Sequence, residues 1–174
     1  NDFAAPDFDY LMRVSQEMTQ VLQELPPPSI SIILEMTLEG LTRGLGMDRA
    51  VFMLLNETRT KLTCKSGLGK QVDELKQQLI IDLTSNQVFK NAVEQRQSLF
   101  LKKSNEDNIS KQIRAMLEGS SYLLMPVVVK NKVIGLFMAD RSSSKRDISQ
   151  QEFIAFQQFC QQTNMGISFL AIQG

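Results

Sequence analysis

Histidine is absent from the 174-residue chain, and its absence restricts the chemistry that the protein can perform. Histidine is the commonest general base near neutral pH and the commonest protein ligand of transition metals. Ser-His-Asp and Cys-His catalytic sites, and haem or zinc sites held by histidine, therefore cannot be built from this chain. We expect no catalytic residues, no bound metal and no cofactor.

Cysteine is scarce, and neither sign of charge is in excess. Cys64 and Cys160 are too few for a disulfide framework, which favours a reducing cytoplasm as the location. Lys plus Arg and Asp plus Glu each number 19, so the formal net charge is zero. A neutral chain gives no electrostatic reason to expect nucleic acid or an anionic membrane as a partner. Because the sequence also lacks an apolar run of about 18 residues, we expect no membrane span.

The chain starts at Asn1 rather than at Met, and we expect it to be a segment of a longer protein. A helix is predicted over 7–25, and the prolines at 26–28 end it because proline lacks the N–H donor that a helix needs. A second helix, rich in Ile, Leu and Met, is predicted over 29–46. The first helix carries a stripe of apolar residues with the alternating spacing of three and four that is typical of coiled coils: Leu11, Val14, Met18, Val21 and Leu25.

Three continuous apolar runs, at 50–55, 122–129 and 133–139, are typical of strands buried on both faces. A strand at 61–65 alternates polar and apolar residues, and the following residues 66–69, with two glycines, are expected to end it. Shorter strands are predicted at 79–83 and 98–101, and short helices at 71–78, 84–95 and 109–117. Ser149 and Glu152 have the spacing of a capping box that opens a long last helix, to about Ala171.

Three of these segments resemble elements of the GAF domain family. Residues 48–55 resemble its first strand, and 124–129 with 133–137 resemble its paired late strands, with Gly135 in the second. The helix after Asp147 is similar to the closing helix of the family. The resemblance implies an α+β fold, profilin-like and related to PAS domains. It also implies a central antiparallel sheet of five to six strands, with long terminal helices on one face and short helices on the other. Residues 1–27 would form an N-terminal dimerisation or linker helix, and 28–174 the GAF-like domain.

The same resemblance implies a regulatory domain that binds a small molecule and controls an attached output domain. Several signatures of specialised members are missing. The Asn-Lys-Phe-Asp-Glu signature of cyclic-nucleotide-binding members is not present in order, and the Cys-His pair of bilin-binding members is impossible here. Members that reduce free methionine sulfoxide need a cluster of cysteines, which this chain lacks.

The family places its pocket on the sheet face that the short middle helices cover. The predicted ligand-binding residues on that face are Cys64, Ile81, Phe89, Ile113, Met125 and Met138. Two alternatives remain open. Side chains such as Phe89 and Met125 would fill the pocket in a ligand-free dimerisation module, and a redox enzyme on the same fold is the third hypothesis.

A homodimer through the first and last helices is also predicted, because an apolar stripe of this size is rarely left in water. Its predicted interface residues are Leu11, Val14, Met18, Val21, Leu25, Phe156 and Cys160. The alternative is that the first helix folds back on its own domain. Asp140 and Arg141, at the end of the last predicted strand, are interpreted as a surface ion pair.

Overall fold

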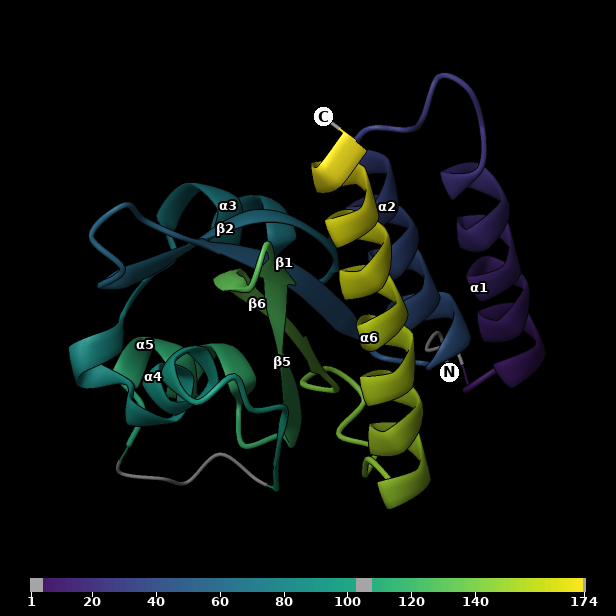
Figure 1. Ribbon diagram of the computed structural model, residues 1–174. Helices are drawn as coiled ribbons and strands as arrows, with labels where there is room; N and C mark the ends of the chain where they lie inside the picture. The colour runs from purple at the N-terminus through teal and green to yellow at the C-terminus, as the bar shows by residue number, and fades with distance from the viewer. Residues whose placement is uncertain (1–4, 103–107, 174) are drawn as a thin grey trace.

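The computed structural model describes residues 5–102 and 108–173 (Figure 1). Its helices are α1 (Phe8–Leu22), α2 (Ile30–Glu39), α3 (Val72–Gln78), α4 (Gln87–Glu94), α5 (Lys111–Leu117) and α6 (Gln150–Gln173), with short helical turns η1 (Gly40–Gly44) and η2 (Leu83–Ser85). Its strands are β1 (Arg49–Leu55), β2 (Lys61–Gly69), β3 (Ile80–Asp82), β4 (Leu99–Leu101), β5 (Tyr122–Val129) and β6 (Lys132–Asp140).

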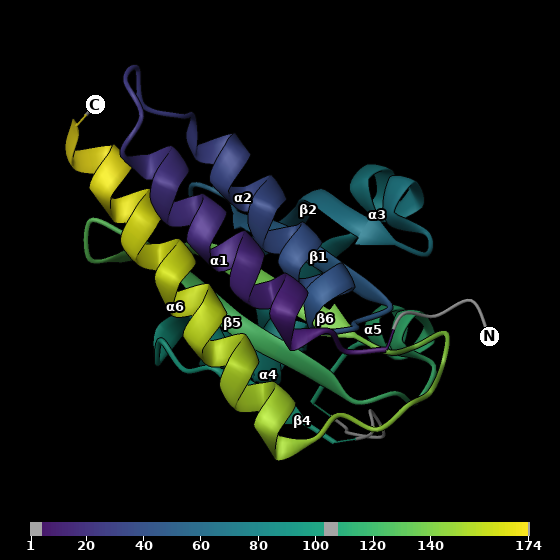
Figure 2. The ribbon, with the colours of Figure 1, turned by 90° about the vertical axis from the view of Figure 1, so that its right-hand side faces the viewer.

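The described residues form one six-stranded antiparallel sheet in the order β3-β2-β1-β6-β5-β4. Helices α1, α2 and α6 lie on one side of this sheet, and α3, α4 and α5 lie on the other (Figures 1 and 2). The predicted α+β fold, with terminal helices on one face and short helices on the opposite face, is confirmed.

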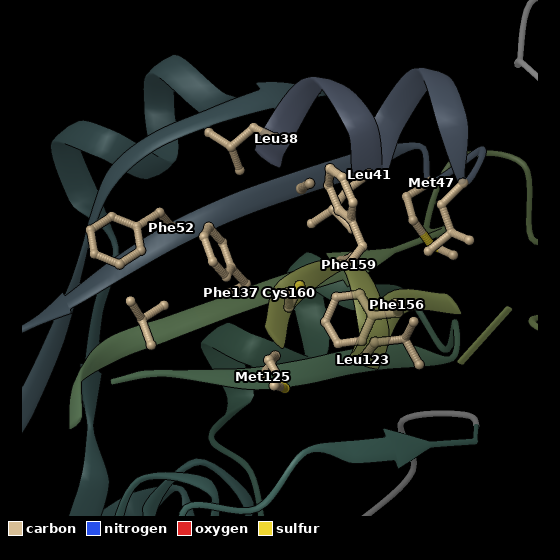
Figure 3. Packing of buried hydrophobic residues seen from close by; sticks show 14 of the residues in the cluster. Leu38, Leu41, Met47, Phe52, Leu123, Met125, Phe137, Phe156, Phe159 and Cys160 are labelled. Carbon is tan, nitrogen blue, oxygen red and sulfur yellow. The ribbon is translucent and has the colours of Figure 1, made fainter. Parts of the chain in front are cut away.

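The continuous apolar strands serve two separate cores because successive side chains of a strand point to opposite faces. In β1, Ala50 and Phe52 belong to the core under the terminal helices, whereas Val51 and Met53 belong to the core under the middle helices. Figure 3 shows part of the first core, where the Phe52 and Phe137 ring centroids lie 5.6 Å apart. Because each face of such a strand packs in a core, its residues are apolar at successive positions and do not alternate with polar ones.

Two local features, a helix start and a hairpin turn, form as the sequence predicts. Ser149 Oγ accepts the N–H of Glu152, and Glu152 Oε1 accepts the N–H of Ser149, which forms the predicted capping box at the start of α6. Lys130 and Asn131 connect β5 to β6, and both have positive φ angles, of 50° and 64°. Left-handed backbone at two central positions is what a two-residue hairpin turn requires.

One boundary differs from the sequence prediction. β2 does not end at residues 66–69 but continues through them, paired with β1. Ser66 lies opposite Phe52 and Cys64 lies opposite Met53, so Lys65 is the extra residue of a β-bulge. A methyl group on Gly67 would lie 2.8 Å from Val51 Cγ1, so glycine permits the close pairing here and does not break the strand.

Candidate functional site

Five of the six predicted ligand-binding residues lie together on the sheet face covered by α3, α4 and α5. Cys64 comes from β2, Ile81 from β3, Phe89 from α4, Ile113 from α5 and Met138 from β6. All five are buried in one apolar core. The sequence therefore predicts the correct face for these five residues. Ligand binding by them stays a prediction.

Aromatic side chains occupy the centre of this face. The Phe89 ring stacks on the Tyr122 ring with centroids 6.2 Å apart and an interplanar angle of 14°, and both side chains are fully buried. Phe89 is thus a packed core residue that joins α4 to β5. A small molecule at this position would have to displace the Phe89–Tyr122 pair, which favours the alternative in which side chains fill the family pocket.

Met125 does not lie with the other five residues, and its predicted position was wrong. It belongs to the core under the terminal helices (Figure 3), on the opposite face of the sheet from Met138. The reason is register. Leu124 pairs with Met138 and Met125 pairs with Phe137, so Met125 and Met138 differ by one position and face opposite ways.

The two cysteines are separated by the sheet. Cys64 lies in the core under the middle helices and Cys160 in the core under the terminal helices. Burial raises the pKa of both thiols, and Cys160 is completely buried. Because the thiolate is the nucleophilic form, neither cysteine is activated, and their placement does not form a redox pair.

The apolar stripe of the first helix packs within its own domain, so the reason for placing it in a dimer interface was wrong. Leu11, Val14 and Met18 are buried in the same core as Phe156 and Cys160. Val21 is half-buried against that core, and Leu25, beyond the end of α1, is 91% exposed. In the structure the first helix folds back on its own domain, as the alternative hypothesis predicts.

Two glycines near the end of the second predicted helix, Gly40 and Gly44, explain this packing. A methyl group on Gly44 would lie 2.8 Å from Leu11 Cβ, and one on Gly40 would lie 2.4 Å from the Phe159 ring. The backbone of η1 therefore approaches α1 and α6 closely. Small residues four apart on a helix are a known signal for such close packing, and this spacing could have indicated the contact from the sequence.

Polar side chains tie α6 to its neighbours. Gln162 Nε2 donates to the Ser15 carbonyl at 2.8 Å and to Thr19 Oγ1 at 3.1 Å, which joins α6 to α1. The buried hydroxyls of Thr37 and Thr163 lie 2.7 Å apart and join α6 to α2. The terminal helices of this domain thus form one connected layer (Figure 2).

A second set of bonds joins α6 to the sheet. Among the described residues, β4 pairs only with Tyr122–Leu124, so the rest of that edge of β5 has no neighbouring strand. Asn164 covers this edge by accepting the N–H of Val128 at 3.0 Å and donating to the Pro126 carbonyl at 3.0 Å. Ser168 Oγ donates to the Val128 carbonyl at 3.3 Å. Side chains of α6 thereby satisfy an edge that would otherwise be unpaired.

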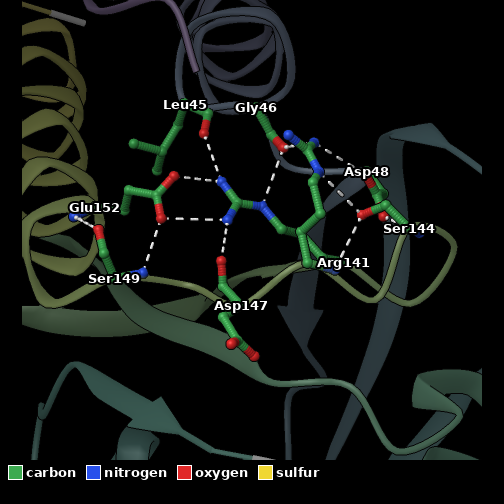
Figure 4. A network of polar contacts seen from close by, with 9 residues as sticks. Leu45, Gly46, Asp48, Arg141, Ser144, Asp147, Ser149 and Glu152 are labelled. Atoms are coloured by element: carbon green, nitrogen blue, oxygen red, sulfur yellow. Dashed lines mark hydrogen bonds and ion pairs between the residues drawn. The ribbon is translucent and has the colours of Figure 1, made fainter. Parts of the chain in front are cut away.

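Asp140 and Arg141 do not form the predicted surface ion pair, and that interpretation was wrong. Arg141 is buried and its guanidinium donates to Glu152 and to the carbonyls of Leu45 and Gly46 (Figure 4). Asp140 instead pairs with Arg49 across the sheet. Burial would raise the pKa of Glu152, but the hydrogen bonds from Arg141 and Ser149 outweigh it and hold that pKa below its ordinary value. Glu152 is therefore charged at neutral pH.

Within residues 5–102 and 108–173, no group of three or more cysteine or acidic side chains is placed to hold a metal ion. No helix in the same ranges is both long and apolar enough to cross a membrane. The polar groups described above bond to other side chains or to the backbone of neighbouring elements, so they position elements of the fold.

Comparison with solved structures supports the fold. The GAF domain/HD domain protein from Geobacter sulfurreducens is 15% identical, with a TM-score of 0.70 over 83% of this chain and 95% of that chain. A methyl-accepting chemotaxis protein, residues 122 to 287, is 21% identical, with a TM-score of 0.72 over 92% and 98%. The GAF domain of a phosphoenolpyruvate-protein phosphotransferase from Coxiella burnetii is 11% identical, with a TM-score of 0.72 over 95% and 97%.

No curated protein gives a significant match to the sequence. A family model of the GAF domain matches residues 29–168. That range holds the whole sheet, the five residues gathered under the middle helices and most of α6. The chain therefore belongs to the GAF domain family.

Proposed function

We propose that this chain is a non-catalytic regulatory domain of a cytoplasmic signalling protein, which binds a small molecule, dimerises, or does both, to control an attached output domain. Relatives of similar structure come from signalling proteins, including a chemotaxis protein and a GAF/HD domain protein. The observation that carries the proposal is the bonding of α6 to the edge of β5 by Asn164 and Ser168.

This bonding gives a physical route for a signal. A change in the β5–β6 hairpin moves the carbonyls and N–H groups that α6 holds, and α6 in turn is joined to α1 through Gln162. A ligand shifts such an equilibrium only by its differential affinity for the two arrangements. If the domain is attached to an output domain, the terminal helices would be the elements next to the connection, so they would carry the change.

The test of ligand binding is a thermal-shift screen of the intact chain against nucleotides and common metabolites. A ligand at one hundred times its Kd stabilises the folded state by about 2.7 kcal/mol. For a domain of this size we expect a rise in Tm of about 5 to 10 °C. If no compound shifts the Tm, the ligand-free alternative, which the filled space around Phe89 and Tyr122 favours, replaces the sensory role.

The surface that best fits a second copy is the outer groove between α1 and α6, which we call the helix groove. Two shallow pockets of about 260 and 290 Å³ follow it, one beside Met12 and one beside Met165 and Phe169, and both are lined by Gln162. Large apolar side chains exposed on these two helices are Phe8, Met12, Ile154, Met165, Phe169 and Ile172. Contiguous exposed apolar patches, unlike scattered apolar residues, mark protein–protein interaction sites.

We expect Met165→Glu/Phe169→Glu to abolish a dimer that the intact chain forms at tens of micromolar, because two buried carboxylates would face each other across a two-fold axis. Sedimentation equilibrium measures the association. Ile80→Glu is the matched control, since Ile80 is also exposed and apolar but lies on the distant edge strand β3. An intact chain that is monomeric at about 50 μM, or a dimer that survives both charges in the helix groove, would contradict this interface.

A further inference from the structure

Four cationic side chains from separate segments gather at one end of the sheet. They are Arg59 of the β1–β2 turn, Lys90 of α4, Arg96 shortly after α4, and Lys132 at the start of β6. Together with Glu94 they line a pocket of about 550 Å³, which we call the basic pocket. Among the described residues, none of the four cations forms an ion pair within 4 Å.

The basic pocket has an excess of positive charge in a chain that has none overall. Lys plus Arg and Asp plus Glu each number 19 in the sequence, whereas the pocket gathers its four cations around a single carboxylate. Like charges brought together repel one another, and an anion placed among them lowers the energy of all of them. The basic pocket is therefore a surface that an anionic partner would stabilise.

The two arginines of the basic pocket are held by the β5–β6 hairpin. Arg59 Nη1 donates to the Val133 carbonyl at 2.9 Å. Arg96 Nη1 donates to Asn131 Oδ1 at 2.7 Å, and its Nη2 donates to the Asn131 carbonyl. Each guanidinium has five N–H donors, so these bonds use a minority of the donors of each arginine. Because the side chains are already positioned, they lose less conformational entropy when they bind a partner.

The rim of the basic pocket is open to solvent. Arg59, Arg96, Lys132 and Glu94 are all exposed. A small-molecule site buries most of the surface of its ligand, and a rim of exposed side chains does not enclose a ligand in this way. A polar, solvent-accessible rim around an apolar centre is instead the usual composition of a protein–protein contact.

The floor of the basic pocket supplies the apolar centre. Leu83, Val93 and Val133 line it, and each is at most 5% exposed. A partner that places an apolar side chain here removes that side chain from water, which stabilises the contact. The pocket therefore suits a partner that carries an apolar group with negative charges on either side of it.

We propose that the basic pocket docks an acidic peptide segment of a partner protein, in which an apolar side chain is flanked by glutamate or aspartate residues. The apolar side chain lies on Val93 and Val133. The flanking carboxylates bind Arg59 and Arg96, because a guanidinium and a carboxylate form two parallel hydrogen bonds. This docking surface goes beyond the proposed sensory function and does not depend on it.

A nucleic acid is the other polyanion that a basic surface can bind. Nucleic acids bind to cations that follow several phosphates along the strand. The basic pocket instead gathers its cations around one apolar floor, with Glu94 among them, in a chain without net positive charge. These features favour an acidic peptide, and an oligonucleotide probe separates the two partners.

Fluorescence anisotropy with the intact chain measures the docking. The probe is a labelled short peptide with a leucine between two pairs of glutamates. We expect a Kd below about 1 mM in dilute buffer, and weaker binding as the salt concentration rises. The same peptide with glutamines in place of the glutamates should not bind, and the peptide with serine in place of leucine should bind severalfold more weakly. An oligothymidylate of the same charge should also bind more weakly.

Arg59→Gly and Arg96→Gly should each weaken binding of the acidic peptide by about threefold to fivefold, the contribution of one exposed ion pair. The φ angles are 61° at Arg59 and 50° at Arg96, in the region that glycine adopts at the least cost, so both variants should keep the fold. Lys145→Gly is the matched control. Lys145 is also an exposed cation with a φ of 61°, but it follows the opposite end of β6, so this variant should bind like the intact chain.

Glu94→Gln keeps the test independent of any loss of fold, because removal of this carboxylate should strengthen binding by about twofold or more. The proposal is overturned if the acidic peptide does not bind, if the glutamine peptide or the serine peptide binds as tightly, or if both arginine variants bind like the intact chain. Tighter binding of the oligothymidylate than of the acidic peptide would also overturn it. Failure of the docking leaves the sensory function standing, and a thermal-shift screen without a hit leaves the docking standing.

Discussion

Asp140→Asn is expected to lower the free energy of unfolding by about 3 to 5 kcal/mol, which is the usual cost of breaking a buried ion pair. Asp140 Oδ2 lies 2.9 Å from Arg49 Nε, and both side chains are essentially inaccessible, at 0% and 1% exposed. The substitution keeps the size of the side chain but leaves the Arg49 guanidinium as an uncompensated charge between β1 and β6.

The remaining bonds of Arg49 do not offset the loss. Its Nη2 donates to the Met116 carbonyl at 3.0 Å and to Ser142 Oγ at 3.1 Å, so it also holds the end of α5 and the segment after β6. These acceptors are neutral, and they stabilise a charged group less than a carboxylate does. Loss of the carboxylate should therefore loosen the contact of three elements at once.

Urea denaturation followed by circular dichroism measures this effect, with the m-value checked for a change in the unfolded state. Glu118→Gln is the matched control, since it removes a carboxylate from the exposed Lys70–Glu118 pair, where the atoms are 3.4 Å apart. An exposed pair contributes less than about 1 kcal/mol. Equal effects of the two substitutions would show that the Asp140 pair is not a structural ion pair.

The order and type of the elements were predictable from local patterns. The apolar runs at 50–55, 122–129 and 133–139 lie in β1, β5 and β6, and the capping box at Ser149 starts α6. The capping box depends on residues that are close in sequence. The three strands are buried on both faces, and a continuous apolar run is enough to indicate such a strand.

The misplaced residues depend on pairings that the sequence does not show. The sequence predicts the wrong face for Met125 because the face depends on the register between β5 and β6, where a shift of one position reverses the side chain. The sequence does not predict that Asp140 is buried, because its partner, Arg49, is 91 positions away and meets it only when β1 pairs with β6. A local sequence pattern cannot identify such a partner.

The first helix shows a different kind of limit. The sequence correctly predicts that its apolar stripe is covered, but the covering surface belongs to the same chain and not to a second copy. The surface that covers the stripe includes Gly40 and Gly44, which allow close contact because they have no side chain. The sequence does not predict the pocket lined by Arg59, Lys90, Arg96 and Lys132 for a related reason, since these residues are scattered in sequence and meet only in the folded chain.

Gly135→Ala is expected to destabilise the domain by about 3 kcal/mol or more, the upper range for a side chain forced into a packed interior. Gly135 lies on β6 opposite Leu54 of β1. A methyl group there would lie 2.0 Å from the Met53 carbonyl oxygen and 3.2 Å from Leu54 Cα. These are backbone atoms, which cannot rotate away, so β1 and β6 would have to separate at the centre of the sheet.

This clash gives a physical reason for the glycine in the strand that resembles the family pattern. Gly166→Ala is the control, because the nearest atom to a methyl group there is Leu22 Cδ1, a movable side-chain atom at 3.0 Å. Alanine also favours a helix over glycine by about 1 kcal/mol, so the control should change stability by less than about 1 kcal/mol. Denaturant midpoints for the two variants give the comparison. If Gly135→Ala unfolds at the same midpoint as the intact chain, β6 does not approach the Met53 carbonyl as closely as the structure has it, and the register of the central strand pair is wrong.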